Sequence, residues 1–411
     1  MKMDKNLHIP QGYRQTEVGV IPDDWEVVRL GKIGNFIGGG TPSTKIKEYW
    51  NGSIPWVSSS DLTEENIYQI HKHRFITDSA IGKSATKKVP KNSVLIVSRV
   101  GVGKVAINKD IICTSQDFQS LIPGNNNCIF LAYLIKDKAK LLASYNQGTS
   151  IKGFVSSDLK NLQIPLPPKQ EQQKIADILT TWDNAINQQT TLIEKKQQLK
   201  KGLMQQLLTA KTRFSEFSDD WKKSKLNDCG EVITGTTPST KIIKYYANGI
   251  YPWVTPTDIA DYKNIYNSKK SLTEAGVQKG RFIKKDSLLI TCIASIGKNA
   301  ILRIDGSCNQ QINAITVNKK FNVDFLYYLI EFKKNILISY AGQGGMMVLN
   351  KNDFSNLIFL FPQLQEQQKI AQALTLANDE ITKLQTESTL LKSQKKGLMQ
   401  KLLTGKVRVK A

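Results

Sequence analysis

The chain has 411 residues, enough for two to four domains, and 40% of them are hydrophobic, which is ordinary for a globular protein. Fifty-seven Lys and Arg stand against 35 Asp and Glu, so the net charge is +22 and polyanions are the expected partners, nucleic acid first and an anionic membrane surface second. The sequence argues against a transmembrane helix, a signal peptide and a disulfide framework. There is no long apolar run, Met1–Lys5 lacks an apolar core, and the five cysteines contain no C-x-x-C pair. A reducing, cytoplasmic location is therefore predicted.

Residues 1–166 predict a mixed globular domain. The runs Val94–Val97 and Ala106–Ile107 are typical of strands, and Phe130–Ala143 has the pattern of a short amphipathic helix. Pro167–Pro168 then ends the domain, and a helix can begin directly after such a proline.

The sequence then repeats itself with an offset of 194 to 197 residues along nearly its whole length. The matching segments are Gly40–Lys45 with Thr236–Lys241, Pro55–Val57 with Pro252–Val254, Glu171–Ala176 with Glu366–Ala371, and Lys201–Gln205 with Lys396–Gln400. A period this long indicates duplication of a whole unit, which can offer two similar surfaces to one target. The predicted class is α+β, with globular domains at 1–166 and 212–361, a central helix within 167–211 and a distal helix within 362–411.

Two long helices are predicted from about Lys169 to Thr209 and from 364 to 404. Seam positions recur there at alternating steps of four and three, which is the heptad pattern of a coiled coil, and they are apolar mainly at the two ends of each helix and polar in places such as Gln189, Lys196 and Lys200. The first seam includes Ile175, Leu179, Trp182, Ile186, Ile193, Leu203 and Leu207, and the second includes Ile370, Leu374, Ile381, Leu391, Leu398 and Leu402. Pairing of the two copies by a pseudo-twofold axis makes the helices antiparallel. The alternative is two separate helices, each folded onto its own globular domain.

A second apolar line runs down the first helix at a spacing of seven residues: Ile178, Ala185, Leu192 and Leu199. The second copy has Ala373, Glu380, Glu387 and Gln394 at these places, so the copies differ. The line fits either a wider core face or a docking face for another protein, and periodicity alone does not separate the two.

No catalytic motif is present in the sequence. Gly101–Lys104 is too short for a nucleotide-binding loop and predicts a tight turn between strands, on which the lysine could also touch phosphate. The three histidines have no metal-ligand spacing, and the Asn-Pro-Pro-Tyr or Asp-Pro-Pro-Tyr tetrapeptide of amino methyltransferases is missing. We therefore expect a binding protein with no catalytic residue, metal or cofactor of its own.

Loop residues with hydroxyl, amide and cationic groups are the candidates for DNA contacts, because these groups bind phosphates and base edges. In the first copy they are Thr41, Ser43, Lys45, Arg99, Lys104, Ser115, Gln116 and Lys152, and in the second they are Thr237, Ser239, Lys241, Lys298, Asn309, Gln310 and Gln343. Taken singly, each also fits a polar loop residue that faces solvent. Trp56 and Trp253 are expected in the core.

The doubled order of globular unit and Glu-Gln-x-x-Ile-Ala helix resembles the specificity subunit of type I restriction–modification systems. The resemblance rests on Ile21–Trp25, Thr41–Ser43, Ile54–Val57, Pro167–Ala176 and Lys201–Thr209, with their partners at Asp219–Trp221, Thr237–Ser239, Pro252–Val254, Pro362–Ala371 and Lys396–Thr404. The second copy departs from the pattern at Phe361–Gln363, where the double proline is lost.

This resemblance implies two target recognition domains, each of which reads one half of a split, asymmetric sequence in double-stranded DNA. It also implies that the helices set the spacer and bind methyltransferase subunits, expected to be two, which bring S-adenosylmethionine and the catalytic residues, and that a nuclease subunit can join. Two other interpretations stay open: a stand-alone two-headed DNA-binding or bridging protein, and a peripheral membrane scaffold.

Overall fold

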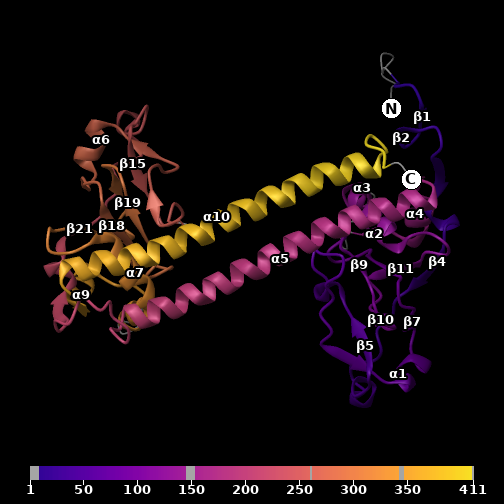
Figure 1. Ribbon diagram of the computed structural model, residues 1–411, viewed down its shortest axis with the longest axis horizontal. Helices are drawn as coiled ribbons and strands as arrows, with labels where there is room; N and C mark the ends of the chain where they lie inside the picture. The colour runs from indigo at the N-terminus through magenta and orange to yellow at the C-terminus, as the bar shows by residue number, and fades with distance from the viewer. Residues whose placement is uncertain (1–8, 145–152, 260–261, 342–346, 410–411) are drawn as a thin grey trace. The chain divides into compact units, whose positions relative to one another are not determined.

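The computed structural model describes residues 9–144, 153–259, 262–341 and 347–409 (Figure 1). The chain forms two compact units, residues 1–190 with 387–411 (unit 1) and residues 191–386 (unit 2). Two long helices, α5 (Lys169–Leu207) and α10 (Leu364–Leu403), contribute to both units. Neither these helices nor any other helix in the described ranges has an apolar stretch that could cross a bilayer.

Unit 1 carries two four-stranded sheets, ordered β4-β11-β8-β9 and β6-β5-β10-β7, beside the ribbons β1-β2 and β3-β12. Its strands are β1 (Tyr13–Thr16), β2 (Gly19–Pro22), β3 (Glu26–Arg29), β4 (Asn35–Gly38), β5 (Ile54–Val57), β6 (Arg74–Ile76), β7 (Lys88–Val89), β8 (Val94–Val97), β9 (Val105–Ile107), β10 (Ile112–Thr114), β11 (Phe118–Ile122) and β12 (Gln163–Leu166). Its short helices are α1 (Asp78–Gly82), α2 (Cys128–Asp137), α3 (Ala139–Ser144) and α4 (Ser156–Asn161).

Unit 2 repeats this plan with one five-stranded sheet, β14-β21-β18-β19-β16, a three-stranded sheet, β17-β15-β20, and the ribbon β13-β22. Its strands are β13 (Lys222–Lys225), β14 (Gly230–Thr234), β15 (Tyr251–Val254), β16 (Asn264–Ile265), β17 (Ser271–Leu272), β18 (Ser287–Thr291), β19 (Asn299–Leu302), β20 (Ser307–Cys308), β21 (Ile312–Val317) and β22 (Ile358–Phe361). Its short helices are α6 (Glu274–Lys279), α7 (Val323–Phe332), α8 (Lys334–Ala341) and α9 (Lys351–Asn356). The α+β prediction with two similar domains is confirmed.

The prediction of one amphipathic helix over Phe130–Ala143 is wrong. The structure ends α2 at Asp137 and begins α3 at Ala139. All six residues from 130 to 135 are buried, so α2 has no polar face along its centre. It crosses the interior of unit 1, and its equivalent α7 does the same in unit 2, where residues 325–330 are all buried.

The shared Glu-Gln motif fixes the start of each long helix. The Gln172 side chain donates to the carbonyl of Pro167 at 3.0 Å and accepts from the backbone N–H of Asn127, the N-cap of α2, also at 3.0 Å. In unit 2, Gln367 makes the same two contacts, each at 2.9 Å, with Pro362 and with Asn322 at the start of α7. Losing the double proline in the second copy therefore leaves this arrangement intact.

The glutamate of the same motif is held by an arginine that follows the other long helix. In unit 1, Arg408 donates to Glu171 through Nε at 2.9 Å and Nη2 at 3.0 Å, and Trp25 Nε1 adds a third bond at 2.9 Å. In unit 2, Arg213 binds Glu366 through Nε at 2.9 Å and Nη2 at 2.8 Å. Both glutamates are buried, so each pair joins one helix start to the end of the other helix.

The two helices run antiparallel in each unit, as predicted for a coiled coil. In unit 1, Asp183 on α5 pairs with Lys395 on α10, and six residues later Gln189 meets Glu387 at 3.3 Å. As the chain advances along α5, its partners on α10 move back.

Unit 2 shows the same antiparallel order. Lys196 forms an ion pair with Glu380 at 2.6 Å, and Lys200 donates to Asn378 at 3.0 Å. The seam isoleucines of the two units, Ile186 and Ile381, are 9% and 6% exposed, so both pack in the interface that the heptads predict. The helices also pack on the domains, because Ile175 and Leu402 belong to the core of unit 1.

One pair of core positions differs in kind between the copies. In unit 2, the buried Lys263 forms an ion pair with Asp324 at 2.9 Å and donates to Thr375 at 2.8 Å. In unit 1 the carbonyl of Ile67 accepts from Ile107 on β9, as that of Lys263 accepts from Ile301 on β19, so Ile67 takes the place of Lys263; Ile67 is fully buried, and Ile129 at the place of Asp324 packs against the core. The repeat thus keeps its fold while the core changes from an apolar pair to an ionic one.

Candidate nucleic-acid interface

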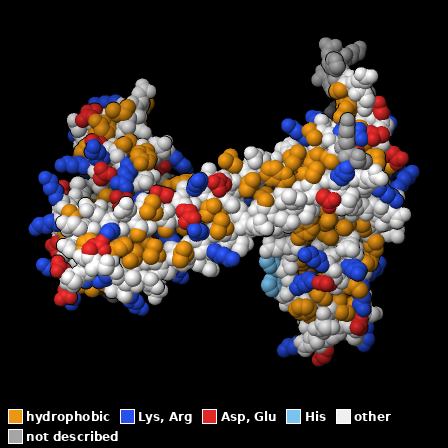
Figure 2. Space-filling model, in the orientation of Figure 1, with side chains coloured by type: hydrophobic (Ala, Val, Ile, Leu, Met, Phe, Trp, Pro, Cys, Tyr) orange, Lys and Arg blue, Asp and Glu red, His pale blue; other side chains and the backbone are white. Residues whose placement is uncertain are grey.

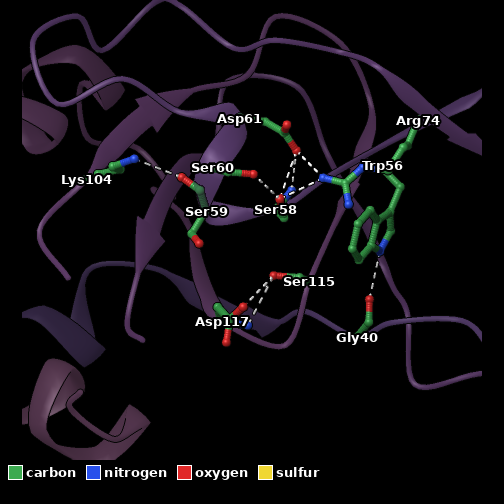
Figure 3. A network of polar contacts seen from close by, with 10 residues as sticks. All are labelled: Gly40, Trp56, Ser58, Ser59, Ser60, Asp61, Arg74, Lys104, Ser115 and Asp117. Carbon is green, nitrogen blue, oxygen red and sulfur yellow. Dashed lines mark hydrogen bonds and ion pairs between the residues drawn. The ribbon is translucent and has the colours of Figure 1, made fainter. Parts of the chain in front are cut away.

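Four loops of unit 1 lie together and form what we call loop surface 1: residues 39–46, 58–61, 98–104 and 114–117 (Figure 3). Three hydrogen bonds join them. The N–H of Gly40 donates to Thr114 O at 2.8 Å, the N–H of Ser115 to Val57 O at 2.9 Å, and Lys104 Nζ to Ser59 O at 3.1 Å. Segments far apart in the sequence therefore present their polar groups at one place.

The Gly-rich loop is anchored by aromatic side chains. The indole N–H of Trp56 donates to Gly40 O at 2.9 Å, and Trp50 donates to Ser43 O at 3.1 Å. The two rings pack edge to face at 5.1 Å, and the prediction that Trp56 lies in the core is confirmed at 4% exposure. Thr41 bonds to Gln116, and both are exposed. Hydroxyl and amide groups are thus fixed in position at the surface.

A second set of hydroxyls surrounds Asp61. Its Oδ2 accepts from the Ser58 N–H at 2.7 Å and from Arg74, whose guanidinium also lies 4.5 Å above the Trp56 ring (Figure 3). Burial raises the pKa of Asp61, but the Ser58 N–H and Arg74 lower it more, so the carboxylate stays ionised. The Ser58 hydroxyl in turn contacts that of Ser60 at 2.9 Å. The exposed Ser60 hydroxyl is therefore held in place on loop surface 1.

Unit 2 builds the same arrangement from residues 235–242, 255–258, 292–298 and 309–311, which we call loop surface 2. Thr237 donates to Gln310 at 2.6 Å, and the indole of Trp253, 6% exposed, donates to Thr236 O at 3.0 Å. Thr255 and Thr257 repeat the hydroxyl pair at 2.9 Å.

Asp258 caps that turn in the second copy. Burial raises its pKa, and the Thr255 hydroxyl with two backbone N–H groups brings it below the usual range. The two loop surfaces thus share one design for holding hydroxyl groups over an ionised aspartate.

The predicted DNA-binding residues fall into three groups in the structure. Most are exposed on the two loop surfaces: Thr41, Ser43, Lys45, Arg99 and Gln116 in unit 1, and Thr237, Ser239, Lys241, Lys298 and Gln310 in unit 2. Ser115 and Asn309 are 2% and 7% exposed and form the turns that display the next residue, Gln116 or Gln310. Lys104 bonds within its loop surface, and Lys152 and Gln343 lie outside the described residues.

The motif Gly101–Lys104 lies in a turn, as predicted, and its counterpart in the second copy does too. Residues 98–104 join β8 to β9, with Val100, Gly101 and Gly103 at positive φ. Residues 292–298 join β18 to β19, with Ala294 and Gly297 at positive φ. Such conformations fit hairpin connections rather than nucleotide-binding loops.

The apolar line on α5 is only partly accessible. Ile178 is half-buried against the core of unit 1, which fits the wider core face. Ala185 is exposed, and Leu192 and Leu199 are 40% and 65% exposed. These three exposed residues remain candidates for a docking face, whereas Ile178 contributes mainly to packing.

Sequence reasoning missed Ser58, Ser60 and Arg74, and their counterparts Thr255 and Thr257. A signal for the hydroxyls was present, because the repeated Pro-Trp-Val is followed in both copies by two hydroxyl residues spaced two apart and then an aspartate. Arg74 had no such signal, since its contacts to the indole and the carboxylate come from strand pairing of β5 with β6.

In the described ranges, no three His, Cys, Asp or Glu side chains gather as metal ligands. His71 and His73 stack at 5.8 Å, and histidines appear at one edge of the surface of unit 1 in Figure 2. Burial raises the pKa of Cys113 to about 11 and that of Cys229 to about 12, so both thiols stay protonated. Lys and Arg side chains, by contrast, are spread over both units in Figure 2.

Comparison with known proteins places this geometry in a family. The model of the type I restriction modification DNA specificity domain matches residues 22–200 and again residues 218–392. The MjaIX specificity subunit of Methanocaldococcus jannaschii is 29% identical over 97% of this chain and 96% of its own length. The specificity subunit of EcoR124I/EcoR124II from Escherichia coli is 35% identical over 40% of this chain and 42% of its own.

Solved structures agree on the fold. The S subunit of a type I restriction-modification system from M. genitalium superposes with a TM-score of 0.60 at 16% identity and covers 97% of this chain and 98% of its own. A chain from a structure of type I system assembly and conformational transition gives a TM-score of 0.58 at 17% identity, over 93% of this chain and 97% of its own. With two family-model matches that together span most of the sequence, the chain belongs to the specificity subunits of type I restriction–modification systems. Specificity subunits are the non-catalytic subunits of such systems.

Proposed function

We propose that loop surfaces 1 and 2 each read one half of a bipartite DNA site. The observation that carries the proposal is that both units have a polar loop surface held by the same internal hydrogen bonds, while some of the exposed side chains differ. Thr41 and Gln116 in unit 1 match Thr237 and Gln310 in unit 2, whereas Arg99 corresponds to Ile293. Gln can bind adenine and Arg guanine bidentately in the major groove, so the two half-sites should differ in sequence.

The methyl transfer is assigned to partner subunits. We propose two methyltransferase subunits, one for each copy of the repeat, that bind S-adenosylmethionine and dock on the long helices. The exposed Leu192 and Leu199 on α5 support a docking face. Changing Leu199 to Glu should weaken co-purification of a methyltransferase subunit, and native mass spectrometry of the complex would count the copies. The purified chain alone, with DNA and labelled S-adenosylmethionine, should transfer no methyl group.

The reading of half-sites is tested by exchanging residues 1–165 for the same segment of a relative. The exchanged protein is reconstituted with methyltransferase subunits, and methylated DNA is sequenced by a single-molecule method. We expect one half of the methylated motif to change and the other half, with its spacer, to stay. A continuous motif, or a change in both halves, would contradict the proposal.

A further inference from the structure

A groove of about 780 Å³ in unit 2 adjoins loop surface 2, with which it shares Lys298, and its other lining residues have no role in the function proposed so far. Its walls come from α5, α7, α8, α10 and the β18–β19 turn. Four lysines line it: Lys200, Lys201, Lys298 and Lys334. The one acidic residue among its lining residues is Glu331.

The charge of the groove is not balanced. Lys200 forms an ion pair with Glu331 at 3.3 Å and donates to Asn378 at 3.0 Å, so Glu331 neutralises that lysine. Lys201, Lys298 and Lys334 form no ion pair with any residue that the structure describes. About three positive charges therefore remain on the walls at neutral pH, which favours an anionic occupant.

The backbone brings two of these lysines together. Gly297, in the β18–β19 turn, has φ +80°, and a Cβ there would come within 2.8 Å of Lys334 Cγ. Glycine thus lets the stem of Lys334 lie directly against the turn that carries Lys298. Any larger residue would push the Lys334 stem away, so the close approach depends on this glycine.

Unit 1 uses the equivalent positions differently. Lys104, on the matching turn, donates to Ser59 O inside loop surface 1, whereas Lys298 has no such bond to the described residues. Lys136 occupies the place of Glu331 and donates to Glu65 O at 2.9 Å. The turn lysine therefore supports a loop in unit 1, and in unit 2 it lines the groove.

We infer that this groove binds phosphates of the DNA backbone next to the half-site read by loop surface 2. The inference rests on the proposed function, because the turn that carries Lys298 is itself part of loop surface 2. Lysines fix a protein on DNA through phosphates without reading bases. The groove would therefore add affinity and salt dependence, and leave the recognised sequence unchanged.

The test compares two double variants of the full chain with equal loss of charge. Lys298→Gln with Lys334→Gln removes two groove cations, and Lys319→Gln with Lys320→Gln removes two exposed cations outside the groove. Binding to a short duplex is measured over a salt series. Each lost phosphate contact lowers the salt slope by about 0.9, so the groove variant should lose roughly 2 and the control nothing. Between about 50 and 200 mM salt, that difference is roughly a tenfold change in relative affinity.

Acetylation of lysines in the unchanged chain gives a second measurement, which does not depend on the folding of a variant. Duplex DNA should protect Lys201, Lys298 and Lys334 from the reagent and leave Lys319 and Lys320 reactive. If the unchanged chain binds no duplex, the proposed function fails as well. If it binds DNA but the slope and the reactivity of the groove lysines stay the same, only the groove inference is overturned. Protection by inorganic phosphate and not by duplex would show a small-anion site and overturn it too.

Discussion

Removing the arginine from each buried helix-start pair should destabilise the two units to different degrees. The side chains of Glu171 and Glu366 are 4% and 1% exposed, so loss of the partner leaves a carboxylate away from water. Breaking a buried ion pair by removing one partner costs about 3 to 5 kcal/mol. Arg213 and Arg408 are themselves 21% and 32% exposed, so water can enter and reduce the cost.

The remaining donors decide the order. In Arg408→Met, Glu171 keeps the indole of Trp25 at 2.9 Å and the backbone N–H of Val409 at 3.3 Å. In Arg213→Met, no other hydrogen bond to Glu366 is present in the described residues, and Trp221 Nε1 has no partner there. One hydrogen bond to a charged group contributes about 1.5 kcal/mol. We therefore expect a loss of about 1 to 2 kcal/mol for Arg408→Met and a larger loss for Arg213→Met.

Hydrogen exchange locates these losses within the full chain. Arg408→Met should speed exchange in the first turns of α5, and Arg213→Met should speed exchange in the first turns of α10, by a larger factor. The double variant Arg213→Met with Glu366→Met should recover part of the loss, because no unpaired carboxylate stays buried. Equal effects of the two single variants, or a double variant that is less stable than the single one, would refute this account.

Three further changes have expected outcomes. Lys263→Ile alone should lower the unfolding free energy of unit 2 by about 3 kcal/mol in urea, because Asp324 loses its ion-pair partner. Adding Asp324→Ile should recover most of that loss, because apolar residues fill both positions in unit 1. A double variant no more stable than Lys263→Ile would contradict this expectation. Gly405→Ala should lower the unfolding free energy by about 2 kcal/mol, because φ is +71° there and a Cβ would lie 2.4 Å from Pro22 Cδ. A thermal unfolding curve like that of the unchanged chain would contradict this. Burial lowers the pKa of Lys136 to about 8, so the unfolded state binds more protons from about pH 8 to 10. Relative to Lys136→Met, the unfolding free energy of the unchanged chain should rise with pH over that window. A fall would show that folding raises the pKa of Lys136 instead of lowering it.

Features with a local or periodic origin could be predicted from the sequence. The heptads predicted the long helices and their pairing, because seam positions such as Ile186 and Ile381 must be buried wherever the helices meet, and the duplication predicted that the pair is antiparallel. The glycine-rich turns followed from the residues that tolerate positive φ. The Thr-Pro-Ser loops were identified as polar surfaces because the same residues occur twice at a constant offset.

Features that depend on contacts between distant segments could not be predicted. The ion pair of Arg408 with Glu171 joins residues 237 positions apart, and neither residue type alone suggests burial. Lys263 belongs to a residue type that normally indicates a surface position. Only the placement of Asp324 beside it on α7 explains how a lysine can be buried there.

The contacts of unit 1 with α5 also define which side chains a recognition domain needs if it is to be exchanged for that of a relative. Residues 1–165 supply Trp25 to Glu171 and Tyr133 to Asp183, and Asp183 also pairs with Lys395. A donor segment with an apolar residue in place of Tyr133 would leave the buried Asp183 with one partner fewer, at a cost of about 1.5 kcal/mol or more. The exposed side chains of loop surface 1 make no such contacts with α5 or α10 among the described residues, so they can change without this cost. Under the proposal that the loops read the half-sites, specificity can vary there while the residues facing the helices stay fixed, and an exchange that respects this division should give a stable protein with one new half-site.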